Sequence, residues 1–481
     1  MSQKSIKINA MLASIQTVMS LIFPLITFPY ISRVLQVEAI GQYNFSASIV
    51  GYFLLLAELG ISTYALREGT RLRNDRMQIS RFAGEMLLLH ILAAAASLFL
   101  LTAALICVQK LQNYWLLIVI LSLQIPLMVF GRVWLYQVYE DFGMLTLTQV
   151  VLQGISVILM FIFVHTPRDL WIYTVIHLIT TSGANLIYGI RSKKYIDPMF
   201  AKFGNLKRHL KPILLIFFTA VTSTIYINSD TTILGWVVDD EAVGLYSVAV
   251  KIYNIVKKVI VAVITVIIPR LTQYAGTDRF NQFFNKVFKT LSALIIPAMF
   301  GVYLLSENIV CIIAGPEYLA ATGAMRFLSI ALGISLFATL FASGVLLPHR
   351  QEKRFLIATV ASALLNVVLN FLLIPYYHQT AAAFTTLLAE LTVLLLCYYS
   401  ARPYISLNGL VRSLLTVGAG CGAIIAVCLW IKSFNLSLYL ETIMCVGVSV
   451  IVYCAVQLLL KNEAFTQALK SLQNMRKRKG Q

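Results

Sequence analysis

The sequence predicts an all-α protein that crosses a lipid bilayer about fourteen times. Hydrophobic residues make up 59% of its 481 residues, charged residues make up only 12%, and the mean hydropathy is +0.82. Soluble domains carry roughly 25% charged residues, so a soluble fold of this composition would have too little polar surface to cover its core. Lipid must therefore be the main solvent of this chain.

Each predicted span is a run of about 20 mostly apolar residues, the length that crosses the hydrocarbon core. The fourteen runs are 8–31, 39–59, 82–108, 114–136, 144–164, 170–190, 212–236, 243–269, 287–305, 321–346, 355–375, 380–400, 411–432 and 438–460. The seven cysteines form no CxxC pair and lie mostly inside these runs, which predicts neither a disulfide framework nor a metal site.

Positive charge gathers in alternate breaks between these runs. Of the 38 Lys and Arg residues, 29 lie in one set of loops and termini, whereas the opposite loops contain Arg33, Lys110, Arg168 and Lys432. Cytoplasmic loops carry this excess, so we expect both termini on the cytoplasmic side of the plasma (inner) membrane. The formal charge of +18 then reflects orientation in the membrane, and no nucleic-acid partner is predicted.

A short internal repeat suggests two similar halves. Residues 38–43 (EAIGQY) recur as residues 241–246 (EAVGLY), an offset of 203 with six predicted helices between the copies. Two six-helix lobes in the same orientation form the parallel repeat of some transporters. The expected parts are an N-lobe (1–192), a cytoplasmic amphipathic linker (193–211), a C-lobe (212–400), two further helices (401–460) and a basic cytoplasmic tail (461–481).

Polar side chains recur at helical spacing in four predicted helices. They either tie neighbouring helices together by hydrogen bonds or line a polar cavity, and their presence in both halves favours the cavity. The candidate cavity residues from these stripes are Gln16, Gln149, Gln153, Tyr226, Asp230, Asn366 and Asn370.

The predicted helix 243–269 also carries positive charge near its middle. Lys251, Asn254 and Lys258 share one face and Lys257 lies beside it. A charged residue at mid-membrane costs about 2.5–3.5 kcal/mol, so these lysines must meet a bound anion, water or a membrane acid such as Asp230, Glu58, Glu85 or Glu390, unless the helix boundary is misplaced. Arg132 is a further cavity candidate, which alternatively extends to the membrane interface.

The sequence contains no GxxxxGK[ST], HExxH or GxSxG pattern, and neither an enzymatic activity nor a bound cofactor is expected. Energy would then come from an H⁺ or Na⁺ gradient, from the membrane potential or from consumption of the product. Asp230 and Glu390 are the candidate protonation sites for such coupling.

Several segments resemble the polysaccharide flippases of the Wzx type, which transport O-antigen, capsule or exopolysaccharide precursors. The resemblance rests on 28–35 (FPYISRVL), 41–43 (GQY), 134–137 (WLYQ), 226–254, 269–271 (PRL), 315–318 (GPEY) and 366–390. Gln36 and Val138 depart from it by replacing commonly expected glycines, and residues 378–380 (HQT) lack the usual glycine-rich turn.

The resemblance implies a fold of the multidrug/oligosaccharidyl-lipid/polysaccharide (MOP) superfamily, with two lobes around a cavity that alternates between inward and outward access. It implies transfer of a polyprenyl-pyrophosphate-linked oligosaccharide from the cytoplasmic to the outer leaflet, near membrane lipids and beside a polysaccharide polymerase and glycosyltransferases. The alternatives are a lipid II flippase or multidrug exporter of the same superfamily, a membrane polymerase or glycosyltransferase, and a scaffolding protein.

Overall fold

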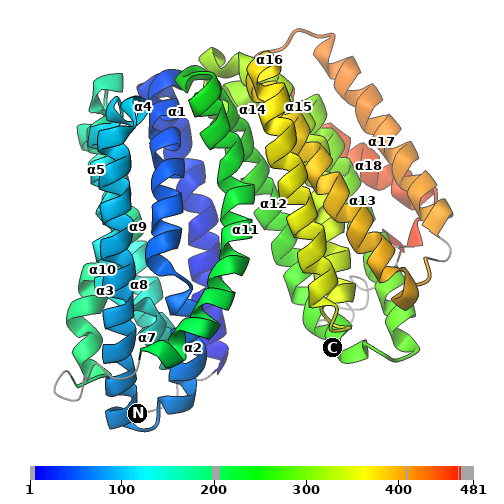
Figure 1. Cartoon of the computed structure of the whole chain (residues 1–481). Helices are drawn as coiled ribbons and strands as arrows, with labels where there is room; N and C mark the ends of the chain where they lie inside the picture. Colours follow the sequence, from blue (N-terminus) through cyan, green and yellow to red (C-terminus); the bar gives the residue numbers. More distant parts are fainter. Residues whose placement is uncertain (1–5, 198–205, 408–409, 464, 467–481) are drawn as a thin grey trace. The chain divides into compact units, whose positions relative to one another are not determined.

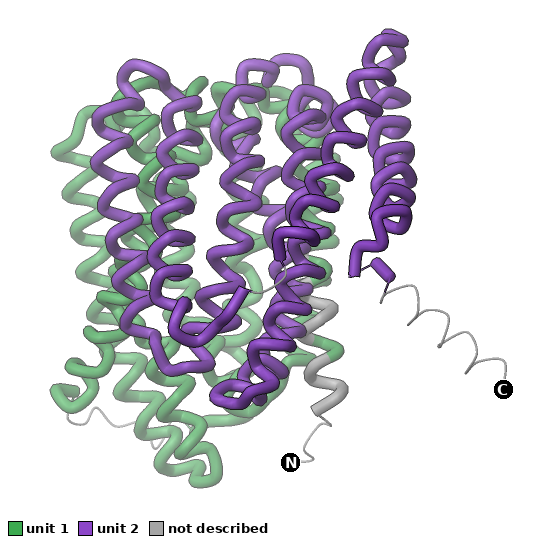
Figure 2. The backbone as a smooth tube through the Cα atoms, turned by 90° about the vertical axis from the view of Figure 1, so that its right-hand side faces the viewer, with its two compact units in different colours: residues 1–244 green, residues 245–481 purple. Residues whose placement is uncertain are grey.

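The computed structural model describes residues 6–197, 206–407, 410–463 and 465–466, and every regular element in that part is a helix. The chain divides into two compact units, Met1–Gly244 (unit 1) and Leu245–Gln481 (unit 2) (Figure 2). The centre of the predicted linker (198–205) and most of the predicted tail (467–481) lie outside the described residues. In α1, the side chains of residues 6–10, 13–17, 20 and 21 also lie outside them.

Unit 1 holds the first eleven α-helices (Figure 1). They are α1 (Ile6–Glu58), α2 (Ile61–Leu72), α3 (Arg76–Cys107), α4 (Gln109–Gln112), α5 (Trp115–Ser122), α6 (Gln124–Gly131), α7 (Val133–Val138), α8 (Phe142–Phe163), α9 (Leu170–Ser182), α10 (Ala184–Arg191) and α11 (Lys207–Val237). α11 begins inside the stretch predicted as a linker, because His209 on its first turn is buried against Glu85 of α3.

The next helix, α12 (Asp240–Tyr274), begins in unit 1 and continues as the first helix of unit 2. The remaining α-helices are α13 (Arg279–Leu304), α14 (Ser306–Ile313), α15 (Thr322–Phe341), α16 (Glu352–Ala401), α17 (Leu410–Lys432) and α18 (Leu438–Leu459). α15 packs against α16 and α13, and α17 packs against α18 and α13. Pro375 lies inside α16, and a short 3₁₀ turn, η6 (Arg402–Tyr404), follows that helix directly.

α1 contains two of the predicted spans joined by a sharp reversal. Gln36 has φ 65° and ψ 179°, a backbone conformation that is essentially restricted to glycine. On its N-terminal side, the Tyr30 hydroxyl donates to the Val164 carbonyl at the end of α8 at 2.7 Å. On its C-terminal side, Tyr43 packs edge-to-face on Tyr173 of α9. α8 and α9 are consecutive helices, and each half of α1 contacts one of them. The two halves of α1 therefore form a helical hairpin beside the pair α8 and α9.

α16 repeats this arrangement in unit 2. His378 has φ 51° and ψ −132°, and two side-chain hydrogen bonds join the helix halves on either side of it. The Ser362 hydroxyl donates to the Ala389 carbonyl at 2.8 Å, and the Thr385 hydroxyl donates to Asn370 Oδ1. The reversals at Gln36 and His378 thus occur where the family resemblance leads one to expect glycine.

The predicted helix 114–136 is broken, which the sequence analysis did not anticipate. It divides into α5, α6 and α7, and Arg132 between the last two is left-handed with φ 49°. Its Nη1 donates to Ser192 Oγ at 3.2 Å, so the break is accompanied by a contact to the end of α10.

The described residues contain eleven helical stretches long and apolar enough to cross a membrane, and a shorter apolar stretch, Trp115–Gly131. Two of the eleven are the stretches Ile22–Leu72 and Glu352–Tyr404, which contain the reversals of α1 and α16. Each of the fourteen predicted spans therefore has a counterpart. The protein is an all-α, multi-pass membrane protein.

Interhelical loops are closed by local caps. The Asp75 carboxylate accepts the backbone N–H groups of Met77 and Gln78 at 2.9 and 3.0 Å at the start of α3. These hydrogen bonds hold the pKa of the Asp75 carboxyl below its ordinary value, and the bond from the Gln78 N–H has the largest effect. Before α2, Gly60 has φ 78°, and a Cβ there would approach Ile216 Cγ2 to 2.9 Å. Glycine is thus required by both the backbone conformation and the packing at this turn.

The glycine of each copy of the repeated stretch packs against the residue directly before the other copy, and all four residues lie in unit 1. A Cβ on Gly41 would meet the Asp240 carbonyl oxygen, and a Cβ on Gly244 would meet the Val37 carbonyl oxygen at 2.1 Å. Gly41 and Gly244 are 203 residues apart, and so are Val37 and Asp240, which is the offset of the repeat. The reciprocal contact explains why each copy carries glycine at its fourth position.

Candidate functional site

One face of α12 carries exposed polar and positively charged side chains. Lys251, Asn254 and Lys258 are all exposed, and their spacing of three and four residues places them on one face of the helix. Among the described residues, no carboxylate forms an ion pair with Lys258. We call Lys251, Asn254 and Lys258 the lysine face; it offers two cations and an amide to an anionic, hydroxyl-rich ligand.

Lys257 lies beside the lysine face but has a different environment. Its Nζ lies 2.9 Å from Glu390 Oε1 of α16, and the side chains are 25% and 8% exposed. Lys257 also donates to the Tyr253 hydroxyl at 2.9 Å, and that hydroxyl donates to the same carboxylate oxygen at 3.0 Å. Ser335 Oγ lies 3.2 Å from the Tyr253 hydroxyl. We call Tyr253, Lys257, Ser335 and Glu390 the buried ion-pair cluster.

This cluster realises one of the alternatives left open by the sequence, an ion pair between a membrane lysine and Glu390. Sequence analysis named both charged partners but missed Tyr253 and Ser335. Tyr253 could have been suspected, because it lies four residues before Lys257 and therefore on the same side of the helix. Ser335 on α15 gave no sequence signal that would bring it to this place.

Two more candidates in unit 2 are buried in the hairpin of α16. Asn366 and Asn370 are 1% and 0% exposed, and Asn370 Nδ2 donates to Asn366 Oδ1 at 3.1 Å. Thr385 donates to Asn370 from the other half of the helix. Hydrogen bonds of this kind hold membrane helices together. These contacts of Asn366 and Asn370 are contacts with other residues of α16.

The candidates in unit 1 lie on several different helices. Asp230 of α11 is 5% exposed, and Tyr226 one turn earlier is half-buried. Gln149 of α8 donates to the Thr180 carbonyl at 3.1 Å, which ties α8 to α9. Gln153 is buried and its Oε1 has no hydrogen-bond partner among the described residues, so this acceptor is available to water or a ligand.

The other two candidates in unit 1 give less information about a cavity. Arg132 is half-buried, and its contact with Ser192 places it at a helix break. Gln16 lies in α1, but its side chain is outside the described residues. Participation of any of these residues in a cavity stays a prediction.

A second buried carboxylate, in unit 1, has basic partners that the sequence analysis did not assign. Glu85 Oε2 of α3 lies 2.7 Å from Arg208 Nη2 and 2.8 Å from His209 Nε2, both on the first turn of α11. The Tyr64 hydroxyl of α2 lies 2.8 Å from His209 Nδ1. This network ties three helices of unit 1 together, and it could not be found from spacing because its members are up to 145 residues apart.

Comparisons with known proteins find relatives over much of the chain. It is 25% identical over 384 residues to the "Putative O-antigen transporter" of Escherichia coli K12, covering 77% of this chain and 91% of that relative. It is 27% identical over 172 residues to the "Probable low-salt glycan biosynthesis flippase Agl15" of Haloferax volcanii, covering 33% of this chain and 34% of that relative.

The fold is similar to that of solved flippases and transporters. The inward closed structure of the lipid II flippase MurJ matches with a TM-score of 0.77 and 16% identity, covering 96% of this chain and 99% of that one. An inward-facing multidrug resistance MATE transporter of the MOP superfamily matches with a TM-score of 0.58 and 13% identity, covering 79% and 93%. These likenesses confirm the predicted fold class.

The family itself is shown by a match along the sequence. Residues 6–275 match the protein family described as "Polysaccharide biosynthesis protein". That stretch is more than half of the chain and extends from α1 to the end of α12, so it contains the lysine face. The resemblance noted from short sequence segments is thereby confirmed: this chain belongs to the polysaccharide biosynthesis protein family.

Proposed function

We propose that this protein is a flippase that moves a polyprenyl-pyrophosphate-linked oligosaccharide from the cytoplasmic to the outer leaflet by alternating access. The observation that carries the proposal is the lysine face, where Lys251 and Lys258 are exposed on a membrane-spanning helix. Leaving the Lys258 cation against lipid would cost about 2.5–3.5 kcal/mol on the insertion scale. A pyrophosphate removes that cost and is bound strongly by charge-assisted hydrogen bonds.

The relatives support the same cargo. Two of them are named for O-antigen transport and for glycan biosynthesis as a flippase, and both names describe movement of saccharide precursors rather than catalysis. The Asn254 amide on the lysine face suits sugar hydroxyls, since it donates and accepts hydrogen bonds. We accordingly propose that the chain is not an enzyme and that it delivers its product to a polysaccharide polymerase after glycosyltransferases have built it.

Orientation and energy coupling belong to the same proposal. The charge asymmetry of the loops supports cytoplasmic termini in the plasma (inner) membrane. Coupling would use an H⁺ or Na⁺ gradient or the membrane potential, with Asp230 and Glu390 as protonation candidates. Glu390 already holds Lys257, so its protonation would release a cation beside the lysine face, which supports Glu390 as the more informative of the two residues to test.

The test is translocation in proteoliposomes that contain the full-length protein. A fluorescent polyprenyl-pyrophosphate oligosaccharide is loaded, and its appearance in the opposite leaflet is followed by accessibility to an external glycosidase. We expect Lys251→Gln/Lys258→Gln to lower the initial rate by roughly ten-fold or more, because each lost charged hydrogen bond is worth about 1.5–3 kcal/mol. Lys353→Gln/Arg412→Gln, which changes two exposed cations elsewhere in unit 2, is the matched control.

Three cargoes separate this proposal from its alternatives. Lipid II in the same assay tests a peptidoglycan-precursor flippase, and a cationic dye tests a multidrug exporter. Equal rates for the double lysine variant and the wild type would contradict the assigned site. Transport of the dye without transport of any pyrophosphate-linked sugar would contradict the proposed function.

A further inference from the structure

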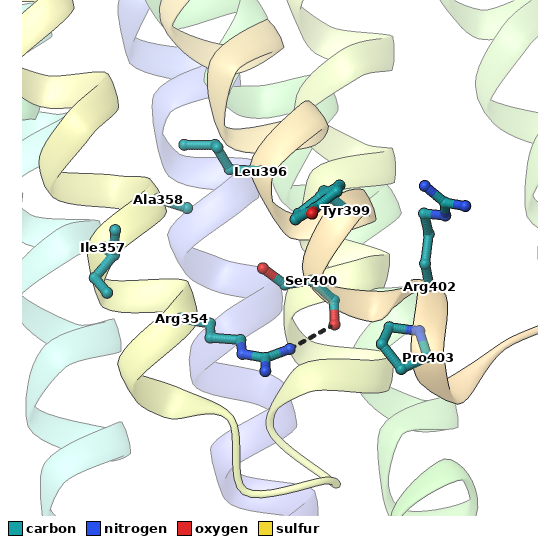
Figure 3. A pocket seen from close by; sticks show the side chains of 8 residues that line it. All are labelled: Arg354, Ile357, Ala358, Leu396, Tyr399, Ser400, Arg402 and Pro403. Carbon is teal, nitrogen blue, oxygen red and sulfur yellow. Dashed lines mark hydrogen bonds between the residues drawn. The ribbon is translucent and has the colours of Figure 1, made fainter.

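An open pocket lies between the two ends of α16 in unit 2, away from the lysine face (Figure 3). It has a volume of about 700 Å³. One wall comes from the first turns of α16, and the other comes from the last turns of that helix and from η6. The lining residues are Arg354, Ile357, Ala358, Leu396, Tyr399, Ser400, Arg402 and Pro403.

The pocket is positively charged. Arg354 and Arg402 line it from different elements, and none of the eight lining residues is acidic. Among the described residues, neither arginine forms an ion pair with a carboxylate. Figure 3 shows Arg354 reaching toward the other end of the helix, where its Nη1 donates to the Ser400 carbonyl at 3.3 Å. Since a guanidinium has five N–H donors, most of the hydrogen-bonding capacity of Arg354 remains for a ligand.

An apolar surface leads away from this charged end. Ile357, Leu364, Val368 and Phe371 are each more than half exposed, at 56, 64, 55 and 59%. Their spacing of seven, four and three residues places them on one side of the first half of α16. Ile357 also lines the pocket, so the apolar stripe begins at the arginines and continues along the first half of α16 to Phe371.

A charged pocket joined to an apolar stripe matches a molecule with an anionic head and a hydrocarbon tail. Arg binds phosphate with a planar fork of donors, and basic pockets between membrane helices on the cytoplasmic side bind anionic head groups. We propose that this pocket binds the phosphate of an anionic phospholipid, whose acyl chains lie along the stripe from Ile357 to Phe371. The site is separate from the proposed cargo site, and its existence does not depend on transport.

The experiment measures lipid bound to the purified full-length protein by native mass spectrometry. Phosphatidylglycerol is compared with phosphatidylcholine, which keeps the tails but has no net charge, and with inorganic phosphate, which has no tails. We expect phosphatidylglycerol to be retained preferentially and to lose affinity roughly ten-fold in Arg354→Gln/Arg402→Gln, since each cation near the membrane surface contributes measurable attraction. Lys353→Gln/Arg412→Gln is the control, and we expect it to bind as the wild type does.

Two results would overturn the proposal. One is equal retention of phosphatidylglycerol by the double arginine variant and the wild type. The other is equal binding of inorganic phosphate alone at the same concentration, which would identify a site for a free anion. If the double variant fails to fold, Arg402→Gln alone carries the test with a drop of roughly three-fold, because the Arg402 side chain makes no hydrogen bond among the described contacts.

Discussion

Two sides of one helix show two different ways of keeping a cation inside a membrane. On one side of α12, Lys257 is held by Glu390 and Tyr253 in the buried ion-pair cluster. On the other, Lys251 and Lys258 are exposed beside Asn254. Lys257 and Lys258 are adjacent in sequence, but neighbouring residues of a helix point about 100° apart. Two adjacent residues of the helix therefore differ in role: Lys257 forms a buried ion pair, whereas Lys258 is exposed and is the lysine that we propose binds the cargo.

The comparison shows what a transfer free energy can decide. The free-energy cost of a cation in the middle of the membrane requires that each lysine have a polar environment. This cost is the same for all three lysines. The kind of polar environment that each lysine has depends on the helix that packs on that side of α12. The α16 carboxylate that reaches α12 meets only Lys257 within ion-pair distance among the described residues.

The largest effect is expected from removing the carboxylate of the cluster. Glu390→Ala leaves the Lys257 ammonium in a place that is only 25% exposed, and an uncompensated buried charge is strongly destabilising. We expect a loss of about 3 kcal/mol in the free energy of unfolding. The measurement is thermal unfolding followed by a thiol-reactive dye, because Cys397 lies seven residues along the same helix and is buried.

Glu352→Ala is the matched control, since it removes an exposed carboxylate from the same helix. We expect it to change stability by less than about 0.5 kcal/mol. Equal unfolding temperatures for Glu390→Ala and Glu352→Ala would show that the buried pair contributes nothing to the fold.

A smaller effect is expected when both partners are replaced by apolar residues. Lys257→Met/Glu390→Leu removes the charges together, and such replacements of buried pairs are often neutral or stabilising. We expect the double variant to unfold within about 1 kcal/mol of the wild type, as measured by the same dye. A double variant as unstable as Glu390→Ala would contradict the assignment of the destabilisation to an isolated lysine charge.

The same double variant also separates structure from transport. If the cluster only holds α12 against α16, oligosaccharide translocation in the double variant should match the wild type. Loss of translocation in a stably folded double variant would instead identify Glu390 or Lys257 as part of the coupling or cargo machinery, and would break the distinction between the two sides of α12.

Much of the fold could be predicted because it follows from solvent and length. The fourteen spans come from apolar runs, and hydrocarbon accepts few other arrangements of backbone. The reversals inside α1 and α16 were also located between predicted spans, near residues 36 and 378. The backbone that makes them was not predictable, because Gln36 and His378 adopt positive φ where propensity alone would favour glycine.

The site was predictable only as a set of residue types. Membrane lysines and acids are rare enough to be picked out one by one, and Lys257 and Glu390 were both named. Their pairing is a contact over 133 residues between α12 and α16, which no helical period can encode. Gln149 belongs to a polar stripe that favours a cavity on sequence alone, but its side chain donates a hydrogen bond to α9. Polar residues at regular helical spacing therefore also occur where side chains hold helices together.

The smallest effect on stability is expected on the lysine face itself. Lys258→Gln changes an exposed residue that forms no ion pair among the described residues, so we expect the free energy of unfolding to move by less than about 0.5 kcal/mol. Translocation should nevertheless fall, because the change removes one of the two cations that we propose bind the cargo pyrophosphate. Loss of stability comparable to that of Glu390→Ala, with translocation unchanged, would mean that Lys258 is a structural residue. Both sides of α12 would then serve to stabilise the fold.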